Sequence, residues 1–360
     1  MPLIKSANTT IIAEIGVNHN GDIDLAKRMI DAAVKCGADI AKFQTFKASR
    51  LVMPNADKAP YQKVTTNPNQ SQEEMLRALE LDESAHYILS EHCKSSGIQF
   101  LSTPFDITSL QFLVEDIGVP WIKIPSGEIV NGPLLYKASQ TGLPIVLSTG
   151  MANEQEIEDA LTIIGQGYTN TSGIPELGIK LTNEQLETVK KNVTLLLCTT
   201  AYPTPYSDVN LRAMNRLRKL FATNIGISDH TAGTAVSVAA VALGATIVEK
   251  HFTLDRTMPG PDQSASLEPD EFSRLVSEIR IIESALGIED IKKLMPSEVE
   301  TINIARQSLY AASDIKKGEI IEEKHLITSR PDTGATPMNY WSLLGSVALR
   351  DYKKNEPIDK

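Results

Sequence analysis

Short runs of apolar, β-branched residues alternate with stretches of helical periodicity over the first three quarters of the chain. The clearest helical face carries Leu25, Met29 and Ala33, and Gly37 follows it as a stop signal. Eight strand–helix repeats in about 270 residues are typical of an α/β protein of the (β/α)8 TIM-barrel type, and we assign residues 1–287 to this barrel. The strands are predicted at residues 10–15, 40–44, 99–103, 121–125, 145–149, 193–198, 224–229 and 246–251.

A doubly wound open sheet is the alternative fold. It is disfavoured because no GxGxxG motif follows the first predicted strand. A long polar segment, residues 47–71, interrupts the alternation after the second strand, where Pro54, Pro60 and Pro68 break it. Loops of this length in a compact domain usually act as lids or contact a substrate. We therefore predict an irregular loop with one of these two roles.

The pattern changes after Gly287. Residues 288–304 are charged and predict a linker with a short helix, whereas residues 305–360 alternate short β-like pieces with turns. We read the latter as a small, mainly β domain. A unit of about 55 residues barely holds a core alone, so we expect it to pack on another domain or another subunit.

Composition and charge narrow the class of protein. Apolar residues make up 42% and charged residues 22% of the chain, as in ordinary globular proteins. The net charge of −10 argues against nucleic acid or an anionic membrane as a partner. Three cysteines without a spacing pattern argue against disulfides and a cysteine zinc site. No signal-peptide layout or membrane-length apolar run is visible, so we expect a cytoplasmic protein.

Polar side chains stand at the end of every predicted strand. Barrel enzymes carry their reacting groups at these C-terminal ends. One Ser or Thr there is usually a helix cap and one Lys usually reaches solvent, but eight polar ends together predict a site. Its candidates are Glu14, Lys42, Gln44, Thr103, Lys123, Ser126, Glu128, Ser148, Tyr202, Ser228, His230, Glu249 and His251.

Two sets within these candidates point to chemistry. His230 and His251 end consecutive strands, where they suit a divalent metal with open positions; a hydrogen-bonded pair or a general base is the alternative. Lys123 with several hydroxyls suits a small anion carrying phosphate and carboxylate. Lys42 or Lys123 could instead form the Schiff base of a class I aldolase.

The motifs at these positions resemble those of bacterial N-acetylneuraminate (sialic acid) synthases, a family that includes legionaminic and pseudaminic acid synthases. The resemblance extends over the whole chain, and the C-terminal part is similar to that family's antifreeze-protein-like (SAF-type) domain. Each motif alone is weak, but their order and spacing together are specific. They are AEIGVNHNG at 13–21, KFQTF at 42–46, STPF at 102–105, KIPSGE at 123–128, LSTGM at 147–151, YPTP at 202–205, SDHT at 228–231, EKHFT at 249–253, PGPD at 259–262 and SRP at 329–331.

The resemblance implies a reaction and a role for each site residue. Phosphoenolpyruvate would condense with the open-chain aldehyde of N-acetylmannosamine, giving N-acetylneuraminate and phosphate by C–O cleavage. A divalent metal would assist, normally Mn²⁺, with Mg²⁺ or Co²⁺ as alternatives. The implied roles are catalysis for Glu128, Glu14 and Lys42; phosphoenolpyruvate binding for Thr103, Lys123, Ser126, Ser148 and Ser228; sugar binding for Gln44, Tyr202, Asp262 and Arg330; and metal binding for His230 and His251.

The family also implies a domain-swapped homodimer, in which Arg330 enters the partner's site. Departures from the family pattern concern Leu197 and Thr200, near the sixth strand end, and Phe43 and Phe46, which replace histidines of one branch. The exact sugar is therefore open, and a 2,4-diacetamido-2,4,6-trideoxyhexose, as in legionaminic or pseudaminic acid synthases, is the alternative substrate. A non-catalytic carbohydrate- or ice-binding module is a more distant alternative.

Overall fold

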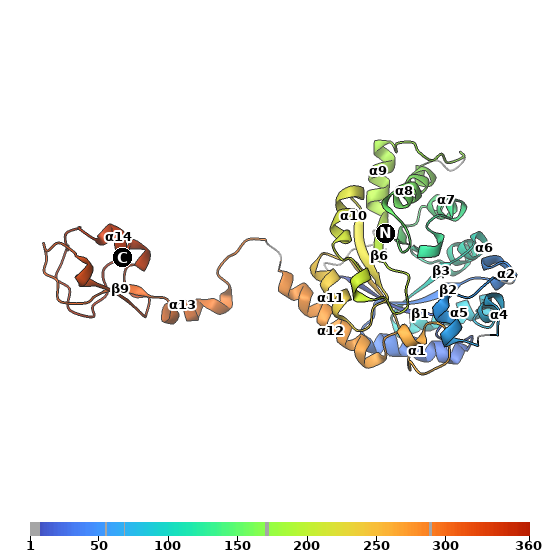
Figure 1. The fold of residues 1–360 in the computed structure, drawn as a ribbon, viewed down its shortest axis with the longest axis horizontal. Coiled ribbons are helices and arrows are strands. Elements are labelled where there is room, and N and C mark those ends of the chain that lie inside the picture. The colour runs from blue at the N-terminus through green and yellow to red at the C-terminus, as the bar shows by residue number, and fades with distance from the viewer. Residues whose placement is uncertain (1–7, 55, 68, 170–172, 288–289) are drawn as a thin grey trace. The chain divides into compact units, whose positions relative to one another are not determined.

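The computed structural model describes residues 8–54, 56–67, 69–169, 173–287 and 290–360. The chain divides into two compact units, Met1–Gly287 and Ile288–Lys360. Residues 288 and 289, at the start of the predicted linker, lie outside the described residues. Figure 1 labels many of the elements of the two units.

The larger unit is built on eight parallel strands, as predicted. Their order is β3-β2-β1-β8-β7-β6-β5-β4, and β3 also contacts β4, so the sheet curls into a nearly closed barrel with helices around it (Figure 1). The (β/α)8 prediction is confirmed. The strands are β1 (Thr10–Gly16), β2 (Ile40–Thr45), β3 (Gln99–Pro104), β4 (Ile122–Ile124), β5 (Ile145–Ser148), β6 (Val193–Cys198), β7 (Asn224–Asp229) and β8 (Ile247–His251).

Helices follow the strands and cover the outside of the barrel. The first has the predicted bounds because Asp22 caps its N-terminus through the N–H groups of Asp24 and Leu25, and Gly37 ends it at φ 82°. The helices are α1 (Ile23–Cys36), α5 (Glu83–Ser96), α6 (Ile107–Gln111), η1 (Phe112–Ile117), η2 (Ser126–Glu128), α7 (Gly132–Gln140), α8 (Glu154–Thr169), α9 (Asn183–Asn192), η3 (Tyr206–Asp208), α10 (Ala213–Phe221), α11 (Ala235–Ala242), η4 (Gln263–Ala265) and α12 (Pro269–Leu286).

The segment after β2 differs from the irregular loop that we predicted. It carries the helices α2 (Ala48–Leu51) and α3 (Pro60–Thr65) and runs into α4 (Gln72–Arg77); residues 55 and 68 within it lie outside the described residues. Pro60 stands in the first turn of α3, where a missing N–H costs nothing, and Ser71 with Glu74 forms a capping box at α4. Local caps therefore make short helices where the prolines indicated a loop.

The smaller unit has its own apolar core, which includes Leu309, Ile315, Ile321 and Tyr352. Its sheet is small: β9 (Ser308–Ala311) pairs antiparallel with β10 (Leu326–Ser329), and isolated bridges join other segments. The other elements of this unit are η5 (Pro296–Glu298), α13 (Val299–Ala305), η6 (Glu323–His325), η7 (Pro337–Asn339) and α14 (Tyr340–Leu343). In the described part of the chain, none of the helices combines the length and the apolar character needed to cross a membrane.

Candidate active site

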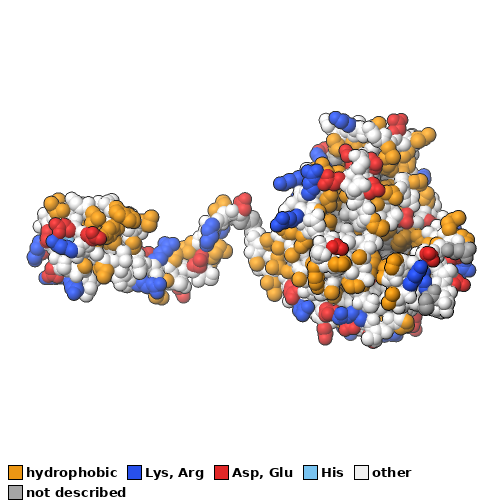
Figure 2. Space-filling view, in the orientation of Figure 1, with side chains coloured by type: hydrophobic (Ala, Val, Ile, Leu, Met, Phe, Trp, Pro, Cys, Tyr) orange, Lys and Arg blue, Asp and Glu red, His pale blue; other side chains and the backbone are white. Residues whose placement is uncertain are grey.

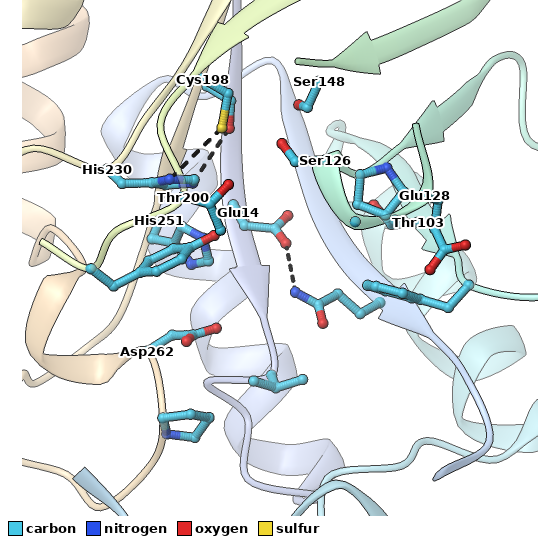
Figure 3. Close-up of a pocket in the computed structure, with 18 of the residues that line it drawn as sticks. Glu14, Thr103, Ser126, Glu128, Ser148, Cys198, Thr200, His230, His251 and Asp262 are labelled. Carbon is cyan, nitrogen blue, oxygen red and sulfur yellow. Dashed lines mark hydrogen bonds between the residues drawn. The ribbon is translucent and has the colours of Figure 1, made fainter. Parts of the chain in front are cut away.

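A pocket of about 420 Å³ opens at the C-terminal ends of the barrel strands, a volume suited to small ligands. It brings together every site residue that we predicted within the larger unit. Figure 3 shows His230, His251 and Asp262 on one side, Ser126, Thr103 and Glu128 on the other, and Glu14 between them. The predicted residues in its lining are Glu14, Lys42, Gln44, Thr103, Lys123, Ser126, Glu128, Ser148, Tyr202, Ser228, His230, His251 and Asp262.

Four buried charges of alternating sign form a row in the pocket: Glu14, Lys42, Glu249 and Lys123. The Lys42 Nζ lies 2.6 Å from a Glu14 carboxylate oxygen and 3.5 Å from an oxygen of Glu249. The Lys123 Nζ lies 3.4 Å from the second oxygen of Glu249, which also accepts a hydrogen bond from the Ser228 hydroxyl at 3.0 Å. Each buried charge therefore has an opposite charge beside it, which offsets part of the cost of desolvation.

The two carboxylates in this row have opposite pKa shifts. Burial raises the pKa of Glu14 to about 7, although Lys42 opposes the shift. Burial would also raise the pKa of Glu249, but Lys123 and Lys42 together outweigh it and lower that pKa to about 2. Glu249 is thus a permanent anion at neutral pH, whereas Glu14 exchanges a proton near neutrality, as an acid–base group must.

Burial lowers the pKa of Lys123, whereas Glu14 and Glu249 outweigh burial at Lys42 and raise its pKa. A Schiff-base lysine must lose its proton to attack a carbonyl. Lys42 is held as an ammonium ion and is a poor candidate for this role, so Lys123 is the stronger candidate under the aldolase alternative.

Hydroxyl and backbone donors gather beside Lys123. Its Nζ donates to the Ser148 Oγ at 2.9 Å, and the Gly150 N–H donates to the Ser126 Oγ at 3.0 Å. A side chain on Gly150 would collide with the hydroxyls of Ser126 and Thr200, so only glycine allows this approach. One cation with several converging donors is the arrangement that binds a phosphate or a carboxylate.

The two predicted metal ligands face each other, with ring centroids 5.3 Å apart. The Nδ1 of His230 lies 2.8 Å from the Thr199 carbonyl oxygen, which can only accept, so in the neutral ring Nδ1 carries the proton and Nε2 keeps its lone pair. Burial and the nearby His230 lower the pKa of His251 well below its usual range, and its buried Nδ1 has no hydrogen-bond partner among the described residues. Burial opposes the charged form of His230 as well, but Cys198 and the Thr199 carbonyl outweigh it and raise the pKa of that imidazole. The His251 imidazole is therefore already in the neutral form that binds a metal, whereas His230 would have to give up its Nε2 proton on binding one.

No set of three or more His, Cys, Asp or Glu side chains in the described part of the chain is placed to hold a metal ion. A metal here would rely on the two imidazoles and take its other ligands from substrate and water. That arrangement is compatible with an ion that acts as a Lewis acid on a bound oxygen.

Three further side chains complete the pocket. Glu128 lies in η2, and the Asn131 amide donates to its carboxylate at 2.6 Å, which orients it. The Tyr202 ring packs against the rings of His230 and of Tyr61 in α3, with ring centroids 4.2 Å and 5.0 Å apart. Burial raises the pKa of Asp262 to about 6.

Sequence reasoning listed Glu249 among the polar strand ends but assigned it no role in the site. Glu249 and His251 are two residues apart in β8, and this spacing places both on one face of the strand, which was an available signal. Tyr61 and Gln72 also line the pocket. They come from the segment after β2, where no local sequence pattern predicted site residues. Arg330 is an exposed residue of the smaller unit, and its contribution to a partner's site stays a prediction.

The departures from the family pattern have distinct environments. Leu197 packs in the apolar core of the barrel, and Thr200 lines the pocket. Phe43 is fully buried and stacks on Phe100 with ring centroids 5.6 Å apart, while Phe46 is buried in a separate apolar cluster. Neither phenylalanine is a lining residue, so any effect of the two on the sugar is indirect.

Comparison with known proteins places the chain in a family. It is 49% identical to the N,N'-diacetyllegionaminic acid synthase of Campylobacter jejuni, covering 97% of this chain and 98% of that protein. It is 43% identical to the enzyme of the same name from Legionella pneumophila, covering 96% and 92%. The crystal structure of N-acetylneuraminic acid synthetase from Leptospira borgpetersenii, in complex with citrate, matches with a TM-score of 0.67 and 34% identity over 82% of this chain and 91% of that one. The SAF domain matches residues 306–360 and the NeuB family matches residues 29–291, so the chain belongs to the NeuB family.

Proposed function

We propose that the chain is a nonulosonic acid synthase that condenses phosphoenolpyruvate with an open-chain, N-acetylated amino sugar. The observation that carries this is one pocket holding both an anion site around Lys123 and a facing pair of imidazoles, His230 and His251. The first binds a phosphorylated acid, and the second suits an ion that polarises an aldehyde. An ice- or carbohydrate-binding module needs neither feature.

The sugar that we propose is a 2,4-diacetamido-2,4,6-trideoxyhexose, in place of our first expectation, N-acetylmannosamine. The two relatives at 49% and 43% identity are both named N,N'-diacetyllegionaminic acid synthase. The structural match named as a sialic acid synthetase is less similar, at 34% identity. Similarity over nearly the whole chain therefore supports the alternative substrate.

In the proposed reaction, the C3 carbon of phosphoenolpyruvate attacks the aldehyde carbon and forms the new C–C bond. When bound by His230 and His251, a divalent ion such as Mn²⁺ would polarise the aldehyde oxygen. Glu14, whose pKa is raised to about 7 so that its protonated form is well populated at neutral pH, gives a proton to that oxygen. The attack leaves C2 electron-deficient, and water adds there while Glu128 takes one of its protons. The C2–O bond to phosphate then breaks with its electron pair going to the phosphate, which also accepts the proton of the new C2 hydroxyl, and the C2 ketone remains. The hydroxyls and Lys123 hold phosphoenolpyruvate beside the sugar aldehyde, and this positioning supplies much of the rate of a bimolecular step.

Assembly is part of this proposal. In a homodimer with exchanged small units, Arg330 of each chain would contact the sugar in the partner's pocket. Large exposed apolar side chains on the small unit, Met338, Trp341 and Leu349, support an interface there. Figure 2 shows hydrophobic side chains gathered on the visible face of that unit.

The test is a synthesis assay with purified protein, phosphoenolpyruvate and Mn²⁺. Separate reactions contain N-acetylmannosamine, its 6-phosphate or 2,4-diacetamido-2,4,6-trideoxyhexoses, and products are identified by mass. We expect a nine-carbon keto acid and an equal amount of phosphate, with the diacetamido sugar as the best substrate. If none of these sugars leads to consumption of phosphoenolpyruvate, the proposal is overturned.

A further inference from the structure

The pocket has two unlike walls. Strand ends of the barrel supply one wall, which carries the charges and hydroxyls described above. The segment between β2 and α5 supplies much of the other, which we call the apolar wall: Leu51, Val52, Met75, Leu76 and Leu79. Nothing in the proposed chemistry at the aldehyde or the phosphate requires these side chains.

The apolar wall is held in place by its own small core. Met75 and Leu79 are buried together with Val17 and Phe46, in a cluster separate from the barrel core. Phe105 packs edge-on against Phe46 with ring centroids 5.9 Å apart. Side chains fixed in this way present a surface of defined shape to a ligand, rather than a mobile loop.

One polar side chain stands in this wall without a partner. Gln72, in the first turn of α4, lines the pocket, and its amide makes no hydrogen bond to any described residue. The neighbouring Gln62 differs, because its Oε1 accepts the Ala59 N–H. A free amide beside methyl-bearing side chains matches an acetamido group, which has an amide to pair and a methyl to bury.

We propose that the apolar wall with Gln72 is the specificity determinant for the sugar, an inference that rests on the proposed synthase function. Gln72 pairs with the second acetamido group, at C4, and the apolar side chains cover its methyl and the C6 methyl of the trideoxy sugar. N-acetylmannosamine carries hydroxyls at both C4 and C6. Those hydroxyls would lose water against Leu51 and Leu76 without gaining a partner.

The size of the expected discrimination follows from the chemistry of such sites. A hydrophobic pocket rejects a ligand with one added hydroxyl by about 100-fold at most, whereas an unpaired polar group in the site costs more. We therefore expect the wild-type kcat/KM for the diacetamido sugar to exceed that for N-acetylmannosamine by at least about 100-fold. Each wall residue should account for about tenfold of this ratio.

The test compares three variants with one matched control. Leu76→Gln and Leu51→Gln keep a side chain of similar volume but place an amide in the wall, and Gln72→Leu removes the free amide. Met53→Gln is the control, because Met53 lies in the same segment but is 79% exposed and does not line the pocket. For each protein, kcat/KM is measured with both sugars, together with the KM for phosphoenolpyruvate and the melting temperature.

We expect the two wall variants to lower the sugar preference about tenfold or more and Gln72→Leu to impair only the diacetamido sugar. The KM for phosphoenolpyruvate should stay within about twofold, and Met53→Gln should behave as wild type. A sugar preference that is unchanged in all three variants overturns the inference. An equal loss of kcat/KM on both sugars in Gln72→Leu also overturns it, since the half-exposed position of Gln72 tolerates substitution. Wild-type activity with N-acetylmannosamine alone would also overturn it while leaving the synthase function intact, whereas inactivity with every sugar would defeat the function itself.

Discussion

Replacing Lys123 by methionine tests the anion site most directly, because it removes one charge and keeps a chain of similar length. The Lys123 Nζ is buried, donates to Ser148 at 2.9 Å and lies 3.4 Å from Glu249. Without it, the row of buried charges holds one lysine and two carboxylates, one of which, Glu249, is ionised at neutral pH. The site would then repel the anion that we propose it binds.

The magnitude follows from Coulomb's law. A phosphate oxygen about 4 Å from an ammonium nitrogen gains about 4 kcal/mol at the effective dielectric constant of about 20 that suits protein sites. Desolvation of Lys123 in the complex offsets part of this gain. We therefore expect a loss of about 2–4 kcal/mol in phosphoenolpyruvate binding, or about 30- to 1000-fold in KM, at 1.4 kcal/mol for each factor of ten.

The assay is the initial rate of phosphate release with varied phosphoenolpyruvate at saturating sugar, supported by calorimetric binding of phosphoenolpyruvate alone. Lys123→Arg keeps the charge and should retain more affinity than Lys123→Met. The KM for the sugar should change little in either variant. A folded Lys123→Met protein with a normal KM for phosphoenolpyruvate would refute the assignment of the anion site.

Four further predictions address the acid–base groups, the metal, the assembly and acid stability. Glu128→Gln should lower kcat by about 10²–10⁴ with little change in phosphoenolpyruvate binding. A near-normal kcat in this variant would mean that another residue, Glu14 first, accepts the proton of the added water. Chelation with EDTA should abolish turnover and Mn²⁺ should restore it, whereas full activity after exhaustive chelation, with a borohydride-trapped adduct on Lys42 or Lys123, would support the aldolase alternative. Mixing Arg330→Ala with His230→Ala under subunit exchange should restore activity, since one site of the heterodimer keeps both residues; continued inactivity despite proven exchange would contradict the swap. Burial lowers the pKa of His19 from 6.5 to about 4, so its contribution to stability is present above pH 6.5 and is lost as the pH falls toward 4. At 1.36 kcal/mol per pH unit this contribution amounts to about 3 kcal/mol. Urea denaturation from pH 7 to 4 should therefore show a smaller loss in the free energy of unfolding for His19→Gln than for wild type.

The barrel itself could be predicted from the sequence because its signals are local. Parallel strands buried on both faces appear as short apolar runs, and caps such as Asp22 and Gly37 mark where helices begin and end. The strand ends of a barrel meet at one rim, so the order of polar residues along the chain was enough to assemble Glu14, His230 and His251.

The tertiary structure decided what depends on distances between segments far apart in the chain. The pKa difference between Glu14 and Glu249 arises because Glu249 faces two lysines and Glu14 only one, which no spacing along the chain reveals. The apolar wall has the same origin. Leu51 belongs to residues 47–71, where prolines and polar residues indicated a loop, and Gln72 and Leu76 follow directly after that segment. These residues line the pocket only because Met75 and Leu79 pack on Val17 and Phe46, which follow β1 and β2. Local sequence therefore determined the scaffold and the kinds of reacting group, while packing between distant segments determined their protonation and the shape offered to the sugar.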